Sequence, residues 1–330
     1  MEKVKVFVTG GTGFIGMHLI KQLLDEGFEV HAIYRSESKI AGMKHNGVTW
    51  FKGDILDLDV LKTAMQGCLQ VYHVAAYASA WEEKPGDFKK YNVQGTINII
   101  ETAREAKVEK IVVTSTAGVF GPSIVKFIDE QSISPLPHFT GYELSKAESE
   151  NLIAQYVQKG MNIVIVNPTR VFGPGLLSES NSVTILIKKY INGKWHFVPG
   201  NGKSIGNYAY VEDVAKGHIL AMKNGKAGQK YILGGENLSY NDIFQQLDAL
   251  TGKRFAKFSI PLWLMLFVAH FLLLLNRLIK LKPAFTPAHV RKFNYNWELS
   301  VDKAVSQLGY QVTPFSQALK KTVEYLSKTK

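Results

Sequence analysis

The sequence has a single cysteine, Cys68, among its 330 residues. One thiol cannot form an internal disulfide or a zinc site built from several cysteines, so nothing in the chain requires an oxidising compartment. We expect Cys68 to be a small buried core residue. The amino-terminal residues MEKVKVFVTGG interleave charges with too short an apolar stretch for a signal peptide, so we expect a cytoplasmic location.

Acidic residues are missing from one long stretch, because no Asp or Glu occurs between Asp248 and Glu298. The net charge of the chain is +11, and eight cations lie in this stretch: Lys253, Arg254, Lys257, Arg277, Lys280, Lys282, Arg291 and Lys292. Removing those eight from the 39 basic residues leaves 31, against 28 acidic ones. The basic character is therefore local, which argues against a nucleic-acid partner.

No apolar run reaches the ~20 residues that a membrane-spanning helix needs. Residues 260–275 are apolar except for His270, and cations follow to residue 282. A helix over 260–281 would bury its side chains in a substrate lobe or a dimer, or insert into a lipid interface. The cations favour contact of residues 260–282 with anionic lipid at the inner face of a membrane, and the alternatives stay open. His270 has no second His or carboxylate at helical spacing, so no metal site is expected.

The first half of the chain alternates short β-rich apolar runs with longer helical patterns. This alternation predicts an α/β fold of the Rossmann type, a doubly wound parallel sheet with helices on both faces. Strands are expected near residues 4–9, 29–34, 48–52, 70–75, 110–114 and 162–167, and helices near 13–26, 57–65, 87–105 and 142–158. Beyond residue 175 Gly, Asn and Lys cluster, which indicates a smaller, loop-rich lobe. We predict a dinucleotide-binding domain over 1–175, to which the chain returns around 205–235, and a mainly substrate-binding lobe over 176–330.

Gly11, Gly13 and Gly16 match the pattern G-x-G-x-x-G between the first expected strand and the first helix. Glycine allows the tight turn, the close backbone approach to a pyrophosphate and the close packing of helix on strand, while the helix N-terminus offers free N–H groups. That placement makes the motif indicative of a dinucleotide site. The expected contacts are Gly10, Gly11, Thr12, Gly13, Phe14, Ile15 and Gly16.

The end of the second strand should fall beside the adenosine ribose of a bound dinucleotide. An acidic residue there would bond a 2′-hydroxyl and repel a 2′-phosphate, but this chain has Arg35, followed by Ser36 and Lys39. A guanidinium suits phosphate by charge and geometry, so NADP(H) is favoured and NAD(H) is the alternative. Asp54, which precedes Ile55 after the third strand, is expected to accept from the adenine amino group or to cap a turn.

Tyr142 and Lys146 stand four residues apart, on one face of an expected helix. A nearby cation stabilises phenolate, so we expect Lys146 to lower the pKa of Tyr142 from about 10 towards neutral pH. Such a phenol could exchange a proton while hydride moves. The pattern Y-x-x-x-K is frequent by chance, and it gains weight here from the glycine motif and from the strand end Thr114-Ser115-Thr116.

With these motifs the chain resembles the extended short-chain dehydrogenase/reductase family, also called the NAD-dependent epimerase/dehydratase family, over nearly all its length. The resemblance implies a catalytic set of Thr116, Tyr142 and Lys146, with Ser115 as the alternative to Thr116. It also implies that Asn92 supports the active-site helix, and that subunits dimerise through a pair of helices from each. The resemblance also implies cofactor contacts in addition to the glycine loop and to Arg35, Lys39, Asp54 and Ile55. These further contacts are Ala75, Ala76, Tyr77, Asn92, Thr114, Tyr142, Lys146, Pro168, Thr169, Arg170 and Val171.

Two departures from the patterns of subfamilies argue against dehydration and against epimerisation of a nucleotide sugar. Sugar-nucleotide dehydratases of the family carry Asp-Glu directly after the catalytic Thr, where this chain has Ala117-Gly118. Nucleotide-sugar epimerases hold the substrate pyrophosphate with an Arg where this chain has Gly206, although Lys203 is an alternative anchor.

Residues 206–215 and Arg35 resemble instead the dihydroflavonol 4-reductase-like and 3β-hydroxysteroid dehydrogenase-like branches. The resemblance thus implies interconversion of a ketone or aldehyde with an alcohol on a relatively apolar small molecule. Epimerisation of a sugar or nucleotide sugar is the first alternative, and a non-catalytic NADP-binding protein is the second.

Overall fold

The computed structural model describes residues 3–40, 47–79, 81–125, 127–177, 181–280, 283 and 285–328. The strands are β1 (Lys5–Thr9), β2 (Glu29–Tyr34), β3 (Val48–Lys52), β4 (Gln70–His73), β5 (Lys110–Thr114), β6 (Ile163–Pro168), β7 (Arg170–Phe172), β8 (Phe197–Pro199), β9 (Ile205–Tyr210), β10 (Lys230–Leu233), β11 (Glu236–Ser239) and β12 (Phe258–Ile260). The α-helices are α1 (Phe14–Asp25), α2 (Glu37–Ile40), α3 (Leu58–Met65), α4 (Gly95–Glu105), α5 (Gly141–Gln158), α6 (Ser182–Ile191), α7 (Val211–Asn224), α8 (Tyr240–Thr251), α9 (Leu262–Ile279), α10 (Pro287–Arg291) and α11 (Phe315–Lys328). Shorter 3₁₀ or π segments are η1 (Lys89–Gln94), η2 (Ala117–Phe120), η4 (Lys292–Asn294) and η5 (Ala304–Leu308).

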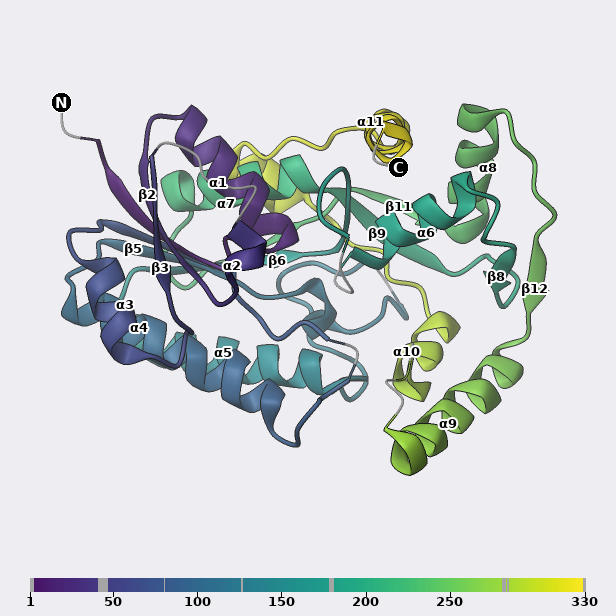
Figure 1. Ribbon diagram of the computed structural model, residues 1–330, viewed down its shortest axis with the longest axis horizontal. Helices are drawn as coiled ribbons and strands as arrows, with labels where there is room; N and C mark the ends of the chain where they lie inside the picture. Colours follow the sequence, from purple (N-terminus) through teal and green to yellow (C-terminus); the bar gives the residue numbers. More distant parts are fainter. Residues whose placement is uncertain are drawn as a thin grey trace.

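A seven-stranded parallel sheet runs in the order β10-β6-β5-β4-β1-β2-β3 (Figure 1). The order reverses between β1 and β4, which is the switch point where Rossmann-type sheets bind ligands at the carboxyl ends of their strands. The predicted Rossmann-type fold is confirmed, and the six strands expected from the first half of the sequence are its β1 to β6.

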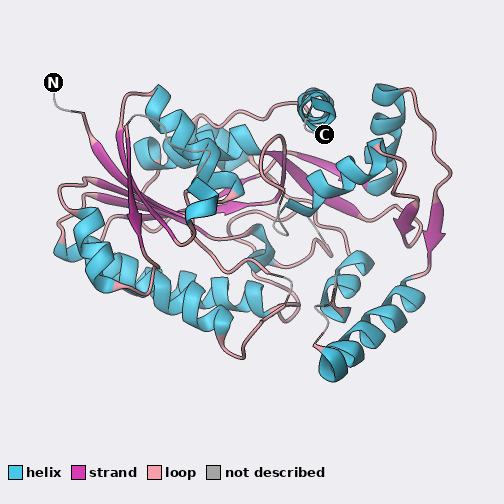
Figure 2. Cartoon of the chain, viewed as in Figure 1, coloured by secondary structure: helices cyan, strands magenta, loops and turns pink. Residues whose placement is uncertain are grey.

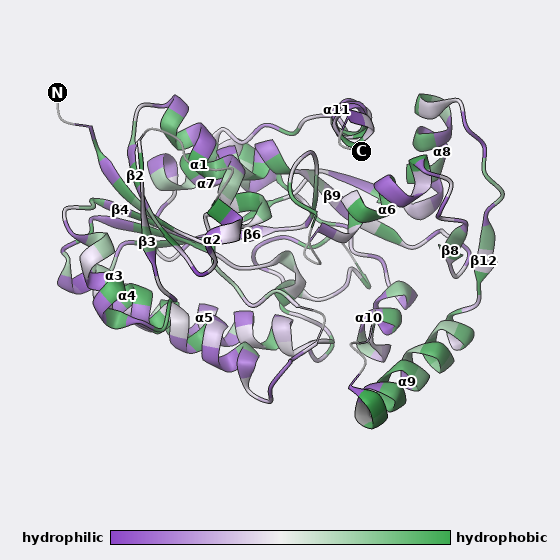
Figure 3. Cartoon of the chain, viewed as in Figure 1, coloured by the Kyte–Doolittle hydropathy of each residue, from purple (hydrophilic) through white to green (hydrophobic). Residues whose placement is uncertain are grey.

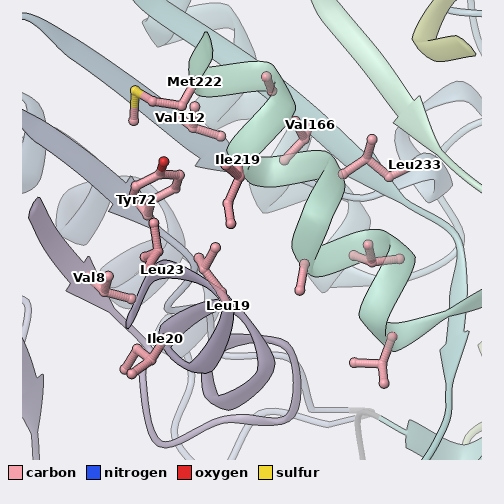
Figure 4. Packing of buried hydrophobic residues seen from close by; sticks show 14 of the residues in the cluster. Val8, Leu19, Ile20, Leu23, Tyr72, Val112, Val166, Ile219, Met222 and Leu233 are labelled. Carbon is pink, nitrogen blue, oxygen red and sulfur yellow. The ribbon is translucent and has the colours of Figure 1, made fainter. Parts of the chain in front are cut away.

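Side chains from successive residues of β1 enter two separate cores, because strand residues alternate between faces. Val6 and Val8 pack in one core with α1 and α7, while Phe7 packs in the other with α3, α4 and α5. Figure 4 shows the first core, where Leu19 and Leu23 of α1 meet side chains from α7 beside the sheet. The sheet is therefore covered on both faces, and the edge at the carboxyl ends of its strands is left for the site.

The chain after residue 175 is more helical than the loop-rich lobe expected from its composition. It contains α6, α7, α8, α9, α10 and α11, together with β9 and β11, which form a small sheet with the preceding β7, and the two-stranded sheet β12-β8 (Figure 2). The Gly, Asn and Lys clusters mark turns between these elements. A capping box, in which Ser239 and Asp242 bond each other's backbone N–H groups, marks the start of α8 and is readable in the sequence.

The expected apolar helix is α9, which is coloured for high hydropathy along most of its length in Figure 3. It packs against α10, at the end of the molecule away from the seven-stranded sheet (Figure 1). Residues 281 and 282, the last of the expected segment, lie outside the described residues. None of the helices in the described ranges combines the length and the hydropathy needed to span a bilayer.

Candidate active site

The glycine loop joins β1 to α1 and leaves no room for larger side chains. A Cβ at Gly16 would lie 2.1 Å from the Gly10 carbonyl oxygen, and one at Gly11 would lie 2.6 Å from the Ile20 side chain. Gly13 is the N-cap residue of α1, with no side-chain cap and no acidic residue in the first turn. The first N–H groups of α1 thus have no side-chain cap, and the glycine loop around them leaves room for an anion.

Gly10 also brings this loop against the chain that follows β4. A Cβ at Gly10 would lie 2.7 Å from the Ala75 nitrogen, and the Ala75 N–H donates to Thr9 Oγ1 at 3.1 Å. The Thr9 hydroxyl also bonds His73 Nδ1 at 2.8 Å, and burial lowers the pKa of His73 to about 3, so this histidine is neutral. The two strand ends at the switch point are therefore held together by backbone and neutral side chains.

At the end of β2, Arg35 is exposed and lies with Nη1 3.6 Å from Asp54 Oδ2. Asp54 also accepts from the Leu56 N–H at 3.1 Å, so it caps the turn that follows β3. Lys39 is exposed on α2, and Ile55 is buried in the core beneath α4. Within the described residues, the Arg35 guanidinium thus pairs with one partly exposed carboxylate, and such pairs contribute little.

Helix α5 carries Tyr142 in its first turn and Lys146 one turn later. A capping box starts the helix: Thr140 Oγ1 accepts from the Glu143 N–H at 3.2 Å, and Glu143 Oε2 accepts from the Thr140 N–H at 3.2 Å. Tyr142 is partly exposed, with its ring 6.4 Å from that of Phe88. Lys146 is 1% exposed, and its Nζ has no hydrogen-bond partner among the described residues.

The pKa values of this pair differ from the sequence-based expectation. Burial raises the pKa of Tyr142, and the neighbouring Glu143 carboxylate raises it further. Burial lowers the pKa of Lys146 to about 8, against a smaller opposing effect of Glu150. The expected lowering of the Tyr142 pKa by Lys146 was wrong, because loss of solvation disfavours the phenolate and the Glu143 carboxylate acts in the same direction.

Asn92, on the π segment η1, joins three parts of the site. Its Nδ2 donates to Ser145 Oγ at 2.9 Å, and its carbonyl accepts from Ser149 Oγ at 2.7 Å, so it contacts α5 about one and two turns after Tyr142. Its Oδ1 accepts from the Tyr77 N–H at 2.7 Å. Asn92 therefore fixes α5 to the chain that follows β4.

Asn167 connects the segment after β5, which carries Ser115 and Thr116, to α5. Asn167 Nδ2 donates both to the Thr116 carbonyl at 3.1 Å and to Glu150 Oε1 at 2.8 Å, and Glu150 pairs with Lys230. Thr116 Oγ1 accepts from the Gly118 N–H at 3.2 Å, which leaves its own O–H available to donate. The Ser115 hydroxyl is buried without a partner in the described structure, whereas the Thr114 hydroxyl bonds His218.

Gly206, the position at which epimerases of the family place an arginine, makes room for a different arginine. A Cβ there would lie 2.4 Å from Nη1 of Arg170, and that guanidinium donates to the Tyr208 hydroxyl at 3.0 Å. Arg170 begins β7, directly after the segment Pro168–Thr169, where the Thr169 hydroxyl is buried without a partner in the described structure. Lys203 is exposed.

Glu143 forms an ion pair with Lys292, which lies 149 positions away and was not predicted as a site residue. Glu143 is almost fully buried, and the Lys292 ammonium also lies 4.5 Å above the Trp297 ring. Gly118 makes room for this carboxylate, since a Cβ there would lie 3.0 Å from Glu143 Oε1. The S/T-x-x-E signature of the capping box marks Glu143 in the sequence, but no local pattern identifies Lys292 as its partner.

These features define a dinucleotide-binding α/β protein whose polar cluster lies on α5, beside the switch point of its sheet. A family model described as the NAD dependent epimerase/dehydratase family matches residues 6–234. A protein of Synechocystis sp. named "Putative dihydroflavonol 4-reductase" is 34% identical over 97% of this chain and 93% of its own length. The mouse sterol-4-alpha-carboxylate 3-dehydrogenase, decarboxylating, is 30% identical over 97% of this chain and 90% of its own length.

Solved structures agree on the fold. A UDP-glucose 4-epimerase from Thermotoga maritima superposes with a TM-score of 0.83 over 99% of both chains at 24% identity. The chain belongs to the NAD-dependent epimerase/dehydratase family, the extended short-chain dehydrogenases/reductases. It is an NAD(P)-binding oxidoreductase of that family.

Proposed function

We propose that the chain is an NADP(H)-dependent enzyme that interconverts a ketone or aldehyde with an alcohol on a relatively apolar small molecule. The observation that carries the proposal is the buried Lys146 ammonium without a hydrogen-bond partner in the described structure, one turn below Tyr142. An unpaired buried charge is costly, so its retention indicates a ligand that completes its hydrogen bonds. The ribose hydroxyls of a dinucleotide held by the glycine loop fit that role.

A bound reduced nicotinamide would supply the hydride that the carbonyl carbon receives in the proposed reaction. Tyr142 donates its proton to the carbonyl oxygen, and burial keeps this phenol protonated at neutral pH. The Thr116 hydroxyl, or that of Ser115, hydrogen-bonds the same oxygen. Lys146 binds the ribose and stabilises the phenolate that remains until solvent returns the proton. The reverse sequence oxidises the alcohol.

Two relatives support an apolar substrate, since their names refer to a dihydroflavonol and to sterols. NADP(H) is preferred in this proposal because Arg35, directly after β2, and Lys39, on α2, are both exposed, and NAD(H) is the alternative. The proposed domains are residues 1–175 with the return around 205–235 for the dinucleotide, and 176–330 mainly for the substrate. We also propose a cytoplasmic homodimer.

Epimerisation is the second candidate, because solved sugar-nucleotide epimerases share the fold. The surroundings of Gly206 weigh against it, since Arg170 is engaged with Tyr208 and the position itself offers no anchor for a diphosphate.

Purified protein incubated with NADPH and a panel of apolar ketones, aldehydes and sugar nucleotides distinguishes the candidates. We expect at least one apolar carbonyl compound to consume NADPH absorbance in step with alcohol formed. Conversion of a sugar nucleotide with no net change in absorbance would instead establish the epimerase.

A further inference from the structure

Helix α9 exposes several large apolar side chains to solvent. Trp263, Phe267 and Leu278 are 70%, 68% and 69% exposed, and Phe271 and Leu274 are about half exposed. Phe258 on β12 extends the exposed apolar surface at the amino-terminal end of the helix. A contiguous apolar surface of this kind marks an interaction site.

The exposed side chains form one stripe along the helix. Residues 263, 267, 271, 274 and 278 recur at spacings of three and four, which places them on a single helical face. The other side carries Ala269, which is fully buried, and packs against α10. One face of α9 is thus held by the chain itself, and the opposite face, the α9 stripe, is left to an outside partner.

Charge indicates which partner fits. The chain has no carboxylate from residue 249 to residue 297, and Arg254 and Lys280, before and after the helix, are both exposed. A second copy docked through the same segment would bring further cations and no carboxylate from this stretch to neutralise them. Anionic lipid headgroups supply the missing negative charge, and acyl chains accept the Trp, Phe and Leu side chains.

We propose that the α9 stripe lies in the plane of an anionic membrane surface, with its apolar side chains among the acyl chains and the flanking cations at the headgroups. This geometry suits a helix that does not span a bilayer. Helix α10 leads from α9 into Lys292, which pairs with Glu143 on α5, so the membrane-facing end is joined to the helix of the proposed active site. That an apolar substrate reaches the site from lipid rests on the proposed function, but the docking itself does not.

The test measures co-sedimentation of the full chain with phosphatidylcholine vesicles, with and without phosphatidylserine, at low and high salt. The apolar variant is Phe267→Ser/Phe271→Ser, matched by Val125→Ser/Ile133→Ser, two loop residues that are more than 90% exposed. The charge variant is Lys280→Glu/Lys282→Glu, matched by Lys223→Glu/Lys226→Glu, whose lysines are exposed around the end of α7. Circular dichroism confirms that each variant is folded.

We expect salt-sensitive binding that requires phosphatidylserine and is lost in the apolar variant. The charge variant should bind roughly tenfold more weakly or worse, because each cation near an anionic surface strengthens binding severalfold. Both matched controls should bind as the original chain does. A second measurement leaves the surface charge unchanged. Brominated lipids should quench the tryptophan fluorescence of the original chain more than that of the Trp263→Phe variant.

Three results would overturn the proposal. The first is absence of binding at low salt together with absence of quenching. The second is equal weakening in the matched controls, which would indicate unspecific attraction by the net charge. The third is a dimer that the apolar variant converts to a monomer while no form binds vesicles, which would assign the α9 stripe to a second copy of the chain.

Discussion

Helices α5 and α9 are both 18 residues long, and each contradicts the usual relation between polarity and burial. Helix α5 buries Glu143, Lys146 and Glu150, whereas α9 exposes Trp263 and Phe267. Charged side chains are rarely fully buried, and large apolar ones rarely cluster on a surface. Both departures cost stability, and our two proposals explain them by partners that complete each surface, a dinucleotide with its substrate at α5 and a lipid surface at α9.

The largest expected effect comes from removing one hydroxyl from α5. Tyr142→Phe should lower turnover by ~10²–10⁴-fold, because only proton transfer is removed. The affinity for NADPH, measured by fluorescence titration, should stay nearly unchanged. Tyr156→Phe is the matched control on the same helix, since its hydroxyl bonds Glu101 instead. Equal turnover in the two variants would refute the assignment.

Truncation of one apolar side chain on each helix tests the comparison through stability. Ile153→Ala on α5 should lower the free energy of unfolding by about 2–5 kcal/mol, because this side chain is 1% exposed in the core. Phe267→Ala on α9 should change it by less than about 0.5 kcal/mol, since its ring packs on little. Urea titration measures both. A comparable loss in Phe267→Ala would show that the α9 stripe is covered in the folded protein.

Lys146→Met should abolish activity and yet stabilise the fold. The pKa of Lys146 is about 8 in the folded chain against 10.5 when unperturbed, so the fold disfavours its protonated form. At about 1.4 kcal/mol per pKa unit, the gain from removing it is at most about 3 to 4 kcal/mol. The destabilisation by Lys146 is complete below pH 8 and disappears as pH rises to 10.5, so the gain should shrink over that range.

The matched control for that prediction is Lys223→Met, an exposed lysine on α7 whose loss should leave stability unchanged at every pH. Urea titrations of both variants across the pH range measure the difference. A Lys146→Met protein that is less stable than the original chain below pH 8 would show that the ammonium has partners that satisfy it.

The smallest expected effect lies outside both helices, at the end of β2. Arg35→Ala should weaken NADPH binding by roughly tenfold, as expected for loss of a charged hydrogen bond, while NADH binding stays the same. The affinity for each cofactor is read from the same titration. Equal loss for both cofactors would remove the preference for NADP(H) from the proposal.

The features that the sequence predicted are those that depend on local patterns of residues. The glycine loop, the strands of the first half and the spacing of Tyr142 and Lys146 all follow from residues close together in the chain. The pairs Glu143–Lys292 and Gly206–Arg170 depend on tertiary packing, so no local pattern revealed them. The direction of the Tyr142 pKa shift was wrong for the same reason, because helical spacing gives the distance to Lys146 but not the burial of either group.

The most direct test of the central claim follows deuterium from NADPH that carries it on the reactive nicotinamide carbon. With a carbonyl compound that the chain consumes, the account predicts one deuterium on the carbinol carbon of the product, one NADP⁺ formed per alcohol, and transfer at least ~10²-fold slower with Tyr142→Phe. Recovery of unchanged deuterated cofactor beside a rearranged substrate, or full transfer by Tyr142→Phe, would contradict it.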